Sequence, residues 1–285
     1  MSNLNNDDQL SIFGSTGFIA SNFISQNCLN FPSHKCIKIP RESRVPDSNK
    51  ILYFISTVDN YNVNNNLHID IDTNLKILMD VLSNCKDKNI EFNFISSWFV
   101  YGKSRLPARE TDYCDPQGFY SITKRCAEQM LISFCETFGI KYRILRLCNV
   151  VGSGDKKISA KKNAIQFMIN LLKENKDVSL YESGYVLRDV MHIKDICKAI
   201  DLVLAKGKLN EIYNIGSGIP QSIREIVEIA KKTLNSSSKL VTIDTPEFHK
   251  QVQARDFYLD VSKLKKLGFN QSINIEKTVK ELCSQ

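Results

Sequence analysis

The sequence lacks any apolar run that approaches the length of a membrane-spanning helix. Its most apolar windows, such as Ile51–Ile55, are far shorter than the ~20 residues that such a helix needs. The opening segment MSNLNNDDQL is polar and acidic, which is the opposite of the basic and then apolar start of a signal peptide. We therefore expect a soluble, cytoplasmic protein that has no membrane partner.

The chain also lacks the spacings that mark a metal centre or a disulfide framework. Its 9 cysteines are dispersed and include no CxxC pair, so we expect reduced thiols that serve as small core residues. The 4 histidines are His34, His68, His192 and His249, and they form no HExxH motif and no close pair. We expect no metal.

Charge of one sign is only in slight excess, because 38 Lys and Arg against 31 Asp and Glu leave a net charge of +7 over 285 residues. A local basic cluster is formed by Lys156, Lys157, Lys161 and Lys162. It contains no aromatic residue, and no nucleic-acid-binding motif accompanies it. We expect no nucleic-acid partner, and the mild positive charge better suits a phosphorylated small molecule.

What the sequence does contain is an ordinary globular composition and an alternation of strand and helix patterns. Hydrophobic residues make up 42% and charged residues 24%, which argues against disorder. Strands are expected at Ser11–Phe13, Lys35–Ile39, Ile51–Ile55, Glu91–Ile95 and Tyr142–Leu147, and helices at Phe18–Leu29, Leu67–Leu82 and Tyr120–Phe138. This alternation predicts an α/β fold with a Rossmann-type doubly wound parallel sheet. After about Val150 the pattern changes, and we expect a smaller C-terminal lobe there.

A glycine-containing loop, Gly14–Ala20, lies between the first expected strand and the first expected helix. Gly14 can turn sharply, and Gly17 lets the backbone approach a pyrophosphate at the helix N-terminus. Ala20 stands where a third glycine often lies, a position that requires only close helix–strand packing. An ordinary tight β–α turn would show the same spacing, so the other motifs of the sequence are needed to distinguish a pyrophosphate-binding loop from a plain turn.

Several segments follow this loop in a fixed order. They are Phe94–Gly102 (FISSWFVYG), Tyr120–Lys124 (YSITK), Arg146–Gly152 (RLCNVVG), Arg188–Asp195 (RDVMHIKD), Tyr213–Gly218 (YNIGSG) and the later Arg255 and Leu259-Asp260. Together with the loop they resemble the extended branch of the short-chain dehydrogenases/reductases, which includes nucleotide-sugar epimerases, dehydratases and reductases. The resemblance covers nearly the whole chain. It implies a dinucleotide-binding domain in residues 1–150 and mainly a substrate-binding lobe in 151–285, with segments returning to the first domain.

The resemblance assigns catalytic roles to Ser97, Tyr120 and Lys124. Tyr120 and Lys124 stand at i and i+4, so they share one face of a helix. A free phenol has a pKa of ~10. A nearby ammonium and the positive charge of a nicotinamide would lower this pKa, so Tyr120 could act as acid or base. Ser96 is the competing choice for the catalytic serine.

The same resemblance implies two sets of binding residues. The cofactor set is Gly14, Ser15, Thr16, Gly17, Phe18, Ile19, Arg41, Ser56, Tyr120 and Lys124, and the substrate set is Ser97, Asn149, Arg188 and Arg255. Arginine suits a diphosphate because its planar fork can donate two parallel hydrogen bonds. A surface salt bridge is the alternative for each arginine taken singly.

Two departures from the family pattern narrow the expected reaction. Trp98 and Phe99 stand where the family's 4,6-dehydratases have an Asp-Glu pair, and neither can transfer a proton, so dehydration is disfavoured. Arg41 follows the second strand and points to NADP(H), while Glu42 keeps NAD(H) possible. Only residues 42–50 precede the next strand, so the usual third β–α unit is nearly absent.

We therefore expect hydride transfer at a carbon, C4 in particular, of a nucleotide-diphosphate sugar. A 4-keto-sugar reductase is favoured, and a 4-epimerase with retained cofactor is the alternative. A catalytically silent cofactor-binding regulator is a distant third, which the intact pair of Tyr120 and Lys124 argues against. The expected assembly is a homodimer.

Overall fold

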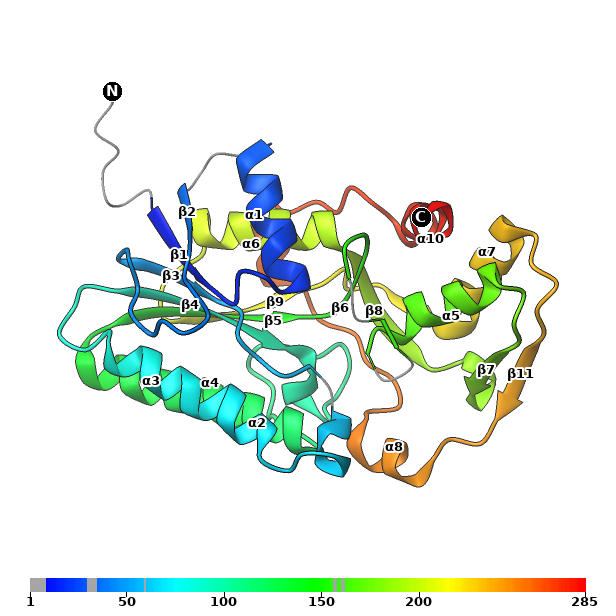
Figure 1. Ribbon diagram of the computed structural model, residues 1–285, viewed down its shortest axis with the longest axis horizontal. Coiled ribbons are helices and arrows are strands. Elements are labelled where there is room, and N and C mark those ends of the chain that lie inside the picture. The colour runs from blue at the N-terminus through cyan, green and yellow to red at the C-terminus, as the bar shows by residue number, and fades with distance from the viewer. Residues whose placement is uncertain (1–8, 30–34, 59, 156–157, 160–161) are drawn as a thin grey trace.

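The computed structural model describes residues 9–29, 35–58, 60–155, 158–159 and 162–285 (Figure 1). Of the basic cluster, Lys156, Lys157 and Lys161 therefore lie outside the described residues. Lys162 is described, and its Nζ pairs with Asp155 Oδ1 at 2.9 Å. Within the described ranges, no helix is long and apolar enough to cross a membrane.

The centre of the fold is a six-stranded sheet in which every neighbouring pair is parallel. Its strands, in spatial order, are β2 (Lys35–Lys38), β1 (Gln9–Phe13), β3 (Lys50–Tyr53), β4 (Glu91–Ser97), β5 (Lys141–Leu147) and β9 (Glu211–Ile215). The chain runs from β1 outward to β2 and then returns to the other side of β1. The strand order thus reverses between β1 and β3, the place where doubly wound sheets bind ligands.

Helices cover both faces of this sheet (Figure 1). On one face lie α1 (Phe18–Leu29) and α6 (Ile193–Lys206), and on the other lie α2 (Ile69–Ile71), α3 (Ile77–Ser83) and α4 (Phe119–Phe138). Alternate residues of each strand enter opposite cores: Ile95 packs in the core beside α1 and α6, while Phe92 and Phe94 pack in the core beside α3 and α4. The predicted doubly wound α/β fold is confirmed.

The prediction of a single regular helix at Leu67–Leu82 is wrong for the middle of this segment. A π-helical segment, Asp72–Lys76, separates α2 from α3. Asn74 lies in this segment and is buried, with its amide hydrogen-bonded to residues outside the helix. A polar side chain that must reach buried partners is a physical reason for the extra residue in that turn, and such bulges often occur near functional sites.

The C-terminal lobe has its own core and two small sheets. The three-stranded sheet has the order β10 (Pro220–Ser222), β8 (Leu187–His192) and β6 (Asn149–Val151), and β7 (Val178–Tyr181) pairs with β11 (Leu240–Ile243). The helices of the lobe are α5 (Ala164–Lys173), α7 (Ile223–Leu234) and α10 (Ile275–Ser284). The short helix α8 (Glu247–Val252) precedes the return of the chain towards the sheet through α9 (Ser262–Lys266). The division at residue 150 stays a prediction.

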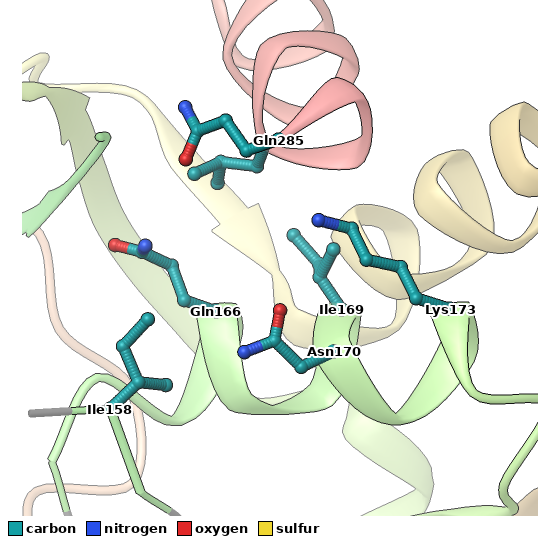
Figure 2. A pocket seen from close by; sticks show the side chains of 7 residues that line it. Ile158, Gln166, Ile169, Asn170, Lys173 and Gln285 are labelled. Carbon is teal, nitrogen blue, oxygen red and sulfur yellow. The ribbon is translucent and has the colours of Figure 1, made fainter. Parts of the chain in front are cut away.

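A surface hollow of about 160 Å³ lies in this lobe between α5 and α10 (Figure 2). Gln166, Asn170 and Lys173 line it from α5, and Gln285 lines it from the chain end beyond α10. None of the predicted catalytic or binding residues lines this hollow.

Candidate active site at the carboxyl edge of the sheet

The loop that joins β1 to α1 has the geometry of a phosphate-binding turn. Gly14 has φ +76°, and a Cβ there would lie 3.1 Å from the backbone nitrogen of Ile55, so glycine is required. Gly17 N donates to Gly14 O at 3.0 Å, Thr16 and Gly17 are exposed, and Ala20 is fully buried. The remaining loop residues of the cofactor set are Ser15, Phe18 and Ile19, which lie in this turn and at the start of α1. The N-terminus of α1 can thus receive an anion at the strand-order reversal.

The two candidate serines at the end of β4 have different environments. Ser96 is buried, and its hydroxyl donates to Glu128 Oε1 at 2.6 Å. Ser97 is half-buried, and its hydroxyl accepts a 3.4 Å hydrogen bond from the Phe99 backbone N–H. Because side chains alternate along a strand, the two hydroxyls leave opposite faces. Ser96 serves the packing of α4, and Ser97 remains the predicted catalytic serine.

Tyr120 and Lys124 occupy the first two turns of α4, beside the end of β4. The side chains are nearly buried, with exposed fractions of 6% for Tyr120 and 2% for Lys124. The ring of Phe99 meets the Tyr120 ring edge-on with the centroids 5.7 Å apart, and Lys124 Nζ lies 4.3 Å above the Phe94 ring. The structure therefore brings Tyr120 and Lys124 to the strand end that carries Ser97.

The N-terminus of α4 is fixed by a side chain from the segment after β3. Asn60 Oδ1 accepts hydrogen bonds from the backbone N–H and the hydroxyl of Ser121, both at 3.2 Å. Gly118 precedes the helix with φ +82°, and a Cβ there would lie 2.6 Å from Asn60 Oδ1. The position of Tyr120 thus depends on a glycine and an asparagine that the sequence analysis missed. Gly118, two residues before Tyr120, was the available sign in the sequence of a tight turn at the start of this helix.

Lys124 is a buried cation whose charge depends on its neighbours. Burial lowers the pKa of Lys124 to about 7, and Glu128, one turn further along α4, opposes that shift. Burial alone would raise the pKa of Glu128, but Arg146 and further donors hold it below its usual value. Arg146 contacts both oxygens of Glu128, at 3.0 and 2.7 Å, and Arg125 donates to Oε2 at 2.8 Å. A fixed carboxylate therefore stands behind Lys124.

The predicted cofactor residue Ser56 is connected to helix α4 through Asn74. Ser56 Oγ donates to Asn74 Oδ1 at 3.0 Å, and Thr57 N donates to the same oxygen at 2.9 Å. Asn74 Nδ2 in turn donates to Thr123 Oγ1 at 2.9 Å, directly before Lys124. The sequence holds one sign of this role, because Asn74 is a polar residue on the apolar face of the helix expected at Leu67–Leu82.

Arg41 lies in an exposed turn beyond β2, the edge strand of the sheet. Residues 39–49 form no helix or strand, as the short connection predicts. Arg44 Nη1 donates to the backbone oxygen of Arg41 at 2.8 Å and shapes the turn. Glu42 is exposed in the same turn, so the geometry is compatible with either nicotinamide cofactor.

Arg188, on β8, is a buried cation whose side-chain hydrogen bonds, among the described residues, go to backbone carbonyl groups. Its Nη1 donates to the oxygens of Leu187 and Arg255 at 2.8 and 2.5 Å, and its Nη2 donates to Ala254 O at 3.3 Å. Burial lowers its pKa to about 10. Among the described residues, no carboxylate lies within 4.0 Å of its guanidinium. Such a charge is suited to an anionic ligand.

The other two predicted substrate residues differ in their exposure. Asn149 is half-buried, and its Nδ2 donates to Asp189 O at 3.0 Å. Arg255 is exposed and pairs with Glu182 at 2.7 Å and Asp256 at 2.9 Å. The side chain of Arg255 thus forms the surface salt bridges that were its alternative, and its role in substrate binding stays a prediction.

An aromatic stack follows Ser97. The Trp98 ring lies between Phe99 and Phe257, with centroid distances of 4.1 and 4.5 Å. Trp98 is 3% exposed, whereas Phe99 is only partly buried. The Arg188 guanidinium lies 5.8 Å from the Trp98 ring. The two aromatic residues therefore place an apolar surface between the predicted catalytic serine and the buried arginine.

A histidine from the C-terminal lobe also lies near this arginine, and the sequence analysis assigned it no role. His249 Nδ1 is hydrogen-bonded to Tyr61 Oη at 2.7 Å, and the Tyr181 ring is 5.0 Å away. Burial first, and Arg188 second, lower the pKa of His249. These residues are far apart in the sequence, so no local pattern could have found the cluster.

Comparison with known proteins gives one family. The sequence model described as the NAD dependent epimerase/dehydratase family matches residues 45–216. A putative UDP-glucose 4-epimerase of Methanocaldococcus jannaschii is 28% identical over 187 residues, which are 65% of this chain and 59% of that protein. A low-salt glycan biosynthesis protein of Haloferax volcanii is 29% identical over 209 residues, 72% of this chain and 65% of that protein. The chain thus covers less than two thirds of the length of either relative.

Solved structures resemble the whole chain. A UDP-glucose 4-epimerase of Thermotoga maritima with UDP-glucose has a TM-score of 0.86 at 20% identity, covering 97% of both chains. A UDP-glucuronic acid 4-epimerase of Bacillus cereus with UDP-glucuronic acid and NAD has a TM-score of 0.87 at 18% identity, and the match covers 97% of this chain and 98% of that one. RMD of Pseudomonas aeruginosa with NADPH has a TM-score of 0.82 at 20% identity, and the match again covers 97% of this chain and 98% of that one. At these identities the likeness shows the fold.

Proposed function

Because this chain belongs to the NAD dependent epimerase/dehydratase family, within the extended short-chain dehydrogenases/reductases, we propose that it transfers hydride at C4 of a nucleotide-diphosphate sugar. The observation that supports this most directly is that Tyr120 contacts Phe99, two residues after Ser97, and that Lys124 contacts Phe94 on the same strand, β4. No elimination is proposed, since Trp98 and Phe99 cannot transfer protons.

The residues of the β1–α1 turn fit a nicotinamide dinucleotide. Gly14 leaves a cradle that a Cβ would fill, and Gly17 is exposed at the N-terminus of α1, where a pyrophosphate is stabilised by backbone N–H groups. Ser56, Tyr120 and Lys124 would hold the rest of the cofactor. When bound, the nicotinamide supplies the hydride acceptor and donor.

The chain's own residues would handle the proton. Tyr120 Oη takes the proton of the C4 hydroxyl as that carbon is oxidised, and it gives a proton back when the ketone is reduced. An ammonium at Lys124 would favour the ionised form of this phenol, and the carboxylate of Glu128 opposes the lowering of the Lys124 pKa by burial. Ser97 Oγ orients the substrate oxygen.

Arg188 supports the nucleotide-diphosphate part of the proposal. It is buried, and the described residues offer it carbonyl groups but no close carboxylate. Asp256 and Glu182 interact with Arg188 without an ion pair, so a substrate diphosphate could bind its guanidinium directly, and Asn149 lies on the adjacent strand β6.

We propose 4-epimerisation with retained cofactor as the form of this chemistry, because the similar proteins named above include 4-epimerases. A 4-keto-sugar reductase is the second candidate, and the exposed Arg41 favours it, since an arginine can bind the 2′-phosphate of NADPH. The expected homodimer remains part of the proposal.

The test is product analysis with a panel of UDP and dTDP sugars. An epimerase should purify with bound nicotinamide and convert each 4-epimer into the other without added cofactor. Stoichiometric consumption of NADPH with a 4-keto sugar would instead establish the reductase. Tyr120→Phe should lower kcat by about 10²–10⁴ while cofactor affinity stays within a few-fold. Near wild-type turnover in this variant would contradict the role of Tyr120.

A further inference from the structure

Phe99 is partly buried and contacts both Ser97 and Tyr120, the two residues proposed to act on the substrate oxygen. Its backbone N–H donates to Ser97 Oγ, and its ring meets that of Tyr120 at a centroid distance of 5.7 Å and an angle of 79°. A sugar oxygen held between Ser97 and Tyr120 therefore has Phe99 beside it. The ring is close to both groups that define the reaction.

The Phe99 ring is held in place from behind. Trp98 stacks on it at 4.1 Å and 26°, and Phe257 stacks on the far side of Trp98 at 4.5 Å and 27°. Trp98 and Phe257 are 3% and 1% exposed, so the stack is anchored in the core. Phe99 is thus a firm apolar wall that a polar substituent cannot push aside at low cost.

The chemistry of a hexose limits what this wall can contact. C4 has two ring neighbours: C3, which carries a hydroxyl, and C5, which carries C6. Apart from the C–H bonds of the sugar ring itself, an apolar group lies next to C4 in these hexoses only when C6 is a methyl group. A C6 hydroxyl against the ring would lose its hydrogen bonds to water, and a C6 carboxylate would lose more.

We propose that Phe99 selects nucleotide sugars whose C6 is a methyl group, that is, 6-deoxyhexoses. This inference rests on the proposed reaction at C4, but not on whether the enzyme epimerises or reduces. Phe99 is the specificity-determining residue, and Trp98 positions it.

The test compares UDP-glucose with UDP-6-deoxyglucose, which differ only at C6, and the two matching dTDP sugars. The ratio of kcat/KM values cancels any preference for the base. We expect the 6-deoxy sugar to be favoured by roughly 10- to 100-fold, as is usual for a hydroxyl in an apolar pocket. Calorimetry with the same sugars should show the same order of affinities.

Variants of Phe99 identify the origin of this preference. Phe99→Leu keeps an apolar wall and should keep most of the ratio, whereas Phe99→Asn should reduce it towards one. Phe134→Asn is the matched control, because Phe134 is also half-buried and contacts another ring, that of Phe138, at a centroid distance of 4.6 Å near the other end of α4. It should leave the ratio unchanged. Thermal unfolding of each variant shows that the fold is intact.

Equal kcat/KM for the two sugars, a preference for UDP-glucose, or a Phe99→Asn ratio equal to the wild-type ratio would each overturn the inference while the proposed reaction stands. Absence of binding and turnover with every sugar of the panel would refute the proposed function, and the inference with it.

Discussion

Arg41 is the residue whose side chain we propose selects between NADP(H) and NAD(H). It is exposed, so its contact with a 2′-phosphate would form only on binding. Arg41→Ala should remove most of any preference for NADPH over NADH, because a hydrogen bond to a charged group contributes about 1.5–3 kcal/mol. Calorimetric titration of both cofactors gives the ratio. Equal affinities in the wild type would refute this role and favour the epimerase with NAD.

The buried charge of Lys124 predicts a pH dependence of stability. Its pKa falls to about 7 in the folded chain from 10.5 in an ordinary lysine, so between these pH values only the unfolded chain binds the proton. Stability should therefore rise with pH in this window, by at most about 1.4 kcal/mol per pH unit for one group, and the full destabilisation is present below pH 7.

Lys124→Met removes this group and leaves the other titrating side chains unchanged. The stability advantage of the variant, measured by urea unfolding of cofactor-free protein, should shrink as the pH rises from 7 to 10. A difference that is constant with pH would show that Lys124 titrates normally.

At the scale of elements, the start of α4 determines where Tyr120 lies. Gly118→Ala should displace Asn60 and strain the left-handed backbone, at a cost of about 1–3 kcal/mol in unfolding free energy. Because Tyr120 follows two residues later, kcat should fall more than the substrate KM rises.

Gly139→Ala is the control at the other end of the same helix. Gly139 also has a positive φ, +67°, but a Cβ there has nothing within 4 Å. It should lose stability without a change in kcat. Similar kinetics for the two alanine variants would argue against positioning of Tyr120 by Gly118.

Elements with a regular apolar period could be predicted, and those with buried polar groups could not. The bounds of α1 match the expected Phe18–Leu29, and α4 begins within one residue of the expected start. In contrast, β8 contains Arg188, Asp189 and His192, which are buried with backbone or side-chain partners, so its sequence shows no alternation. Only the family motif in Arg188–Asp195 indicated that this segment is important. Ser97, Tyr120 and Lys124 could be proposed because each lies in a short motif of neighbouring residues, whereas Asn60, Asn74 and His249 form contacts between distant segments.

At the scale of the whole molecule, α8 connects the C-terminal lobe to the sheet domain. Val252 lies next to Gly118, and His249 is bonded to Tyr61. The segment that follows α8 supplies the carbonyl groups of Ala254 and Arg255 that hold Arg188. A diphosphate at Arg188 would therefore stabilise the contact between the two halves.

Hydrogen exchange should reveal this coupling. Addition of UDP should slow exchange at the amides of Glu247–Val252, while those of α10, packed elsewhere in the lobe, should change little. Protection of α10 alone, or of neither helix, would place the nucleotide away from Arg188.

The nearly absent third β–α unit has a consequence for the evolution of this enzyme. Beyond β2 the chain forms a solvent-facing turn at Arg41 and Glu42, with no further strand or helix before β3. Substitutions at these two positions disturb no packed element, so they cost little stability. A lineage with this architecture can therefore change its preference between NAD(H) and NADP(H) through substitutions in a single surface turn, while α4 and the C-terminal lobe keep their packing.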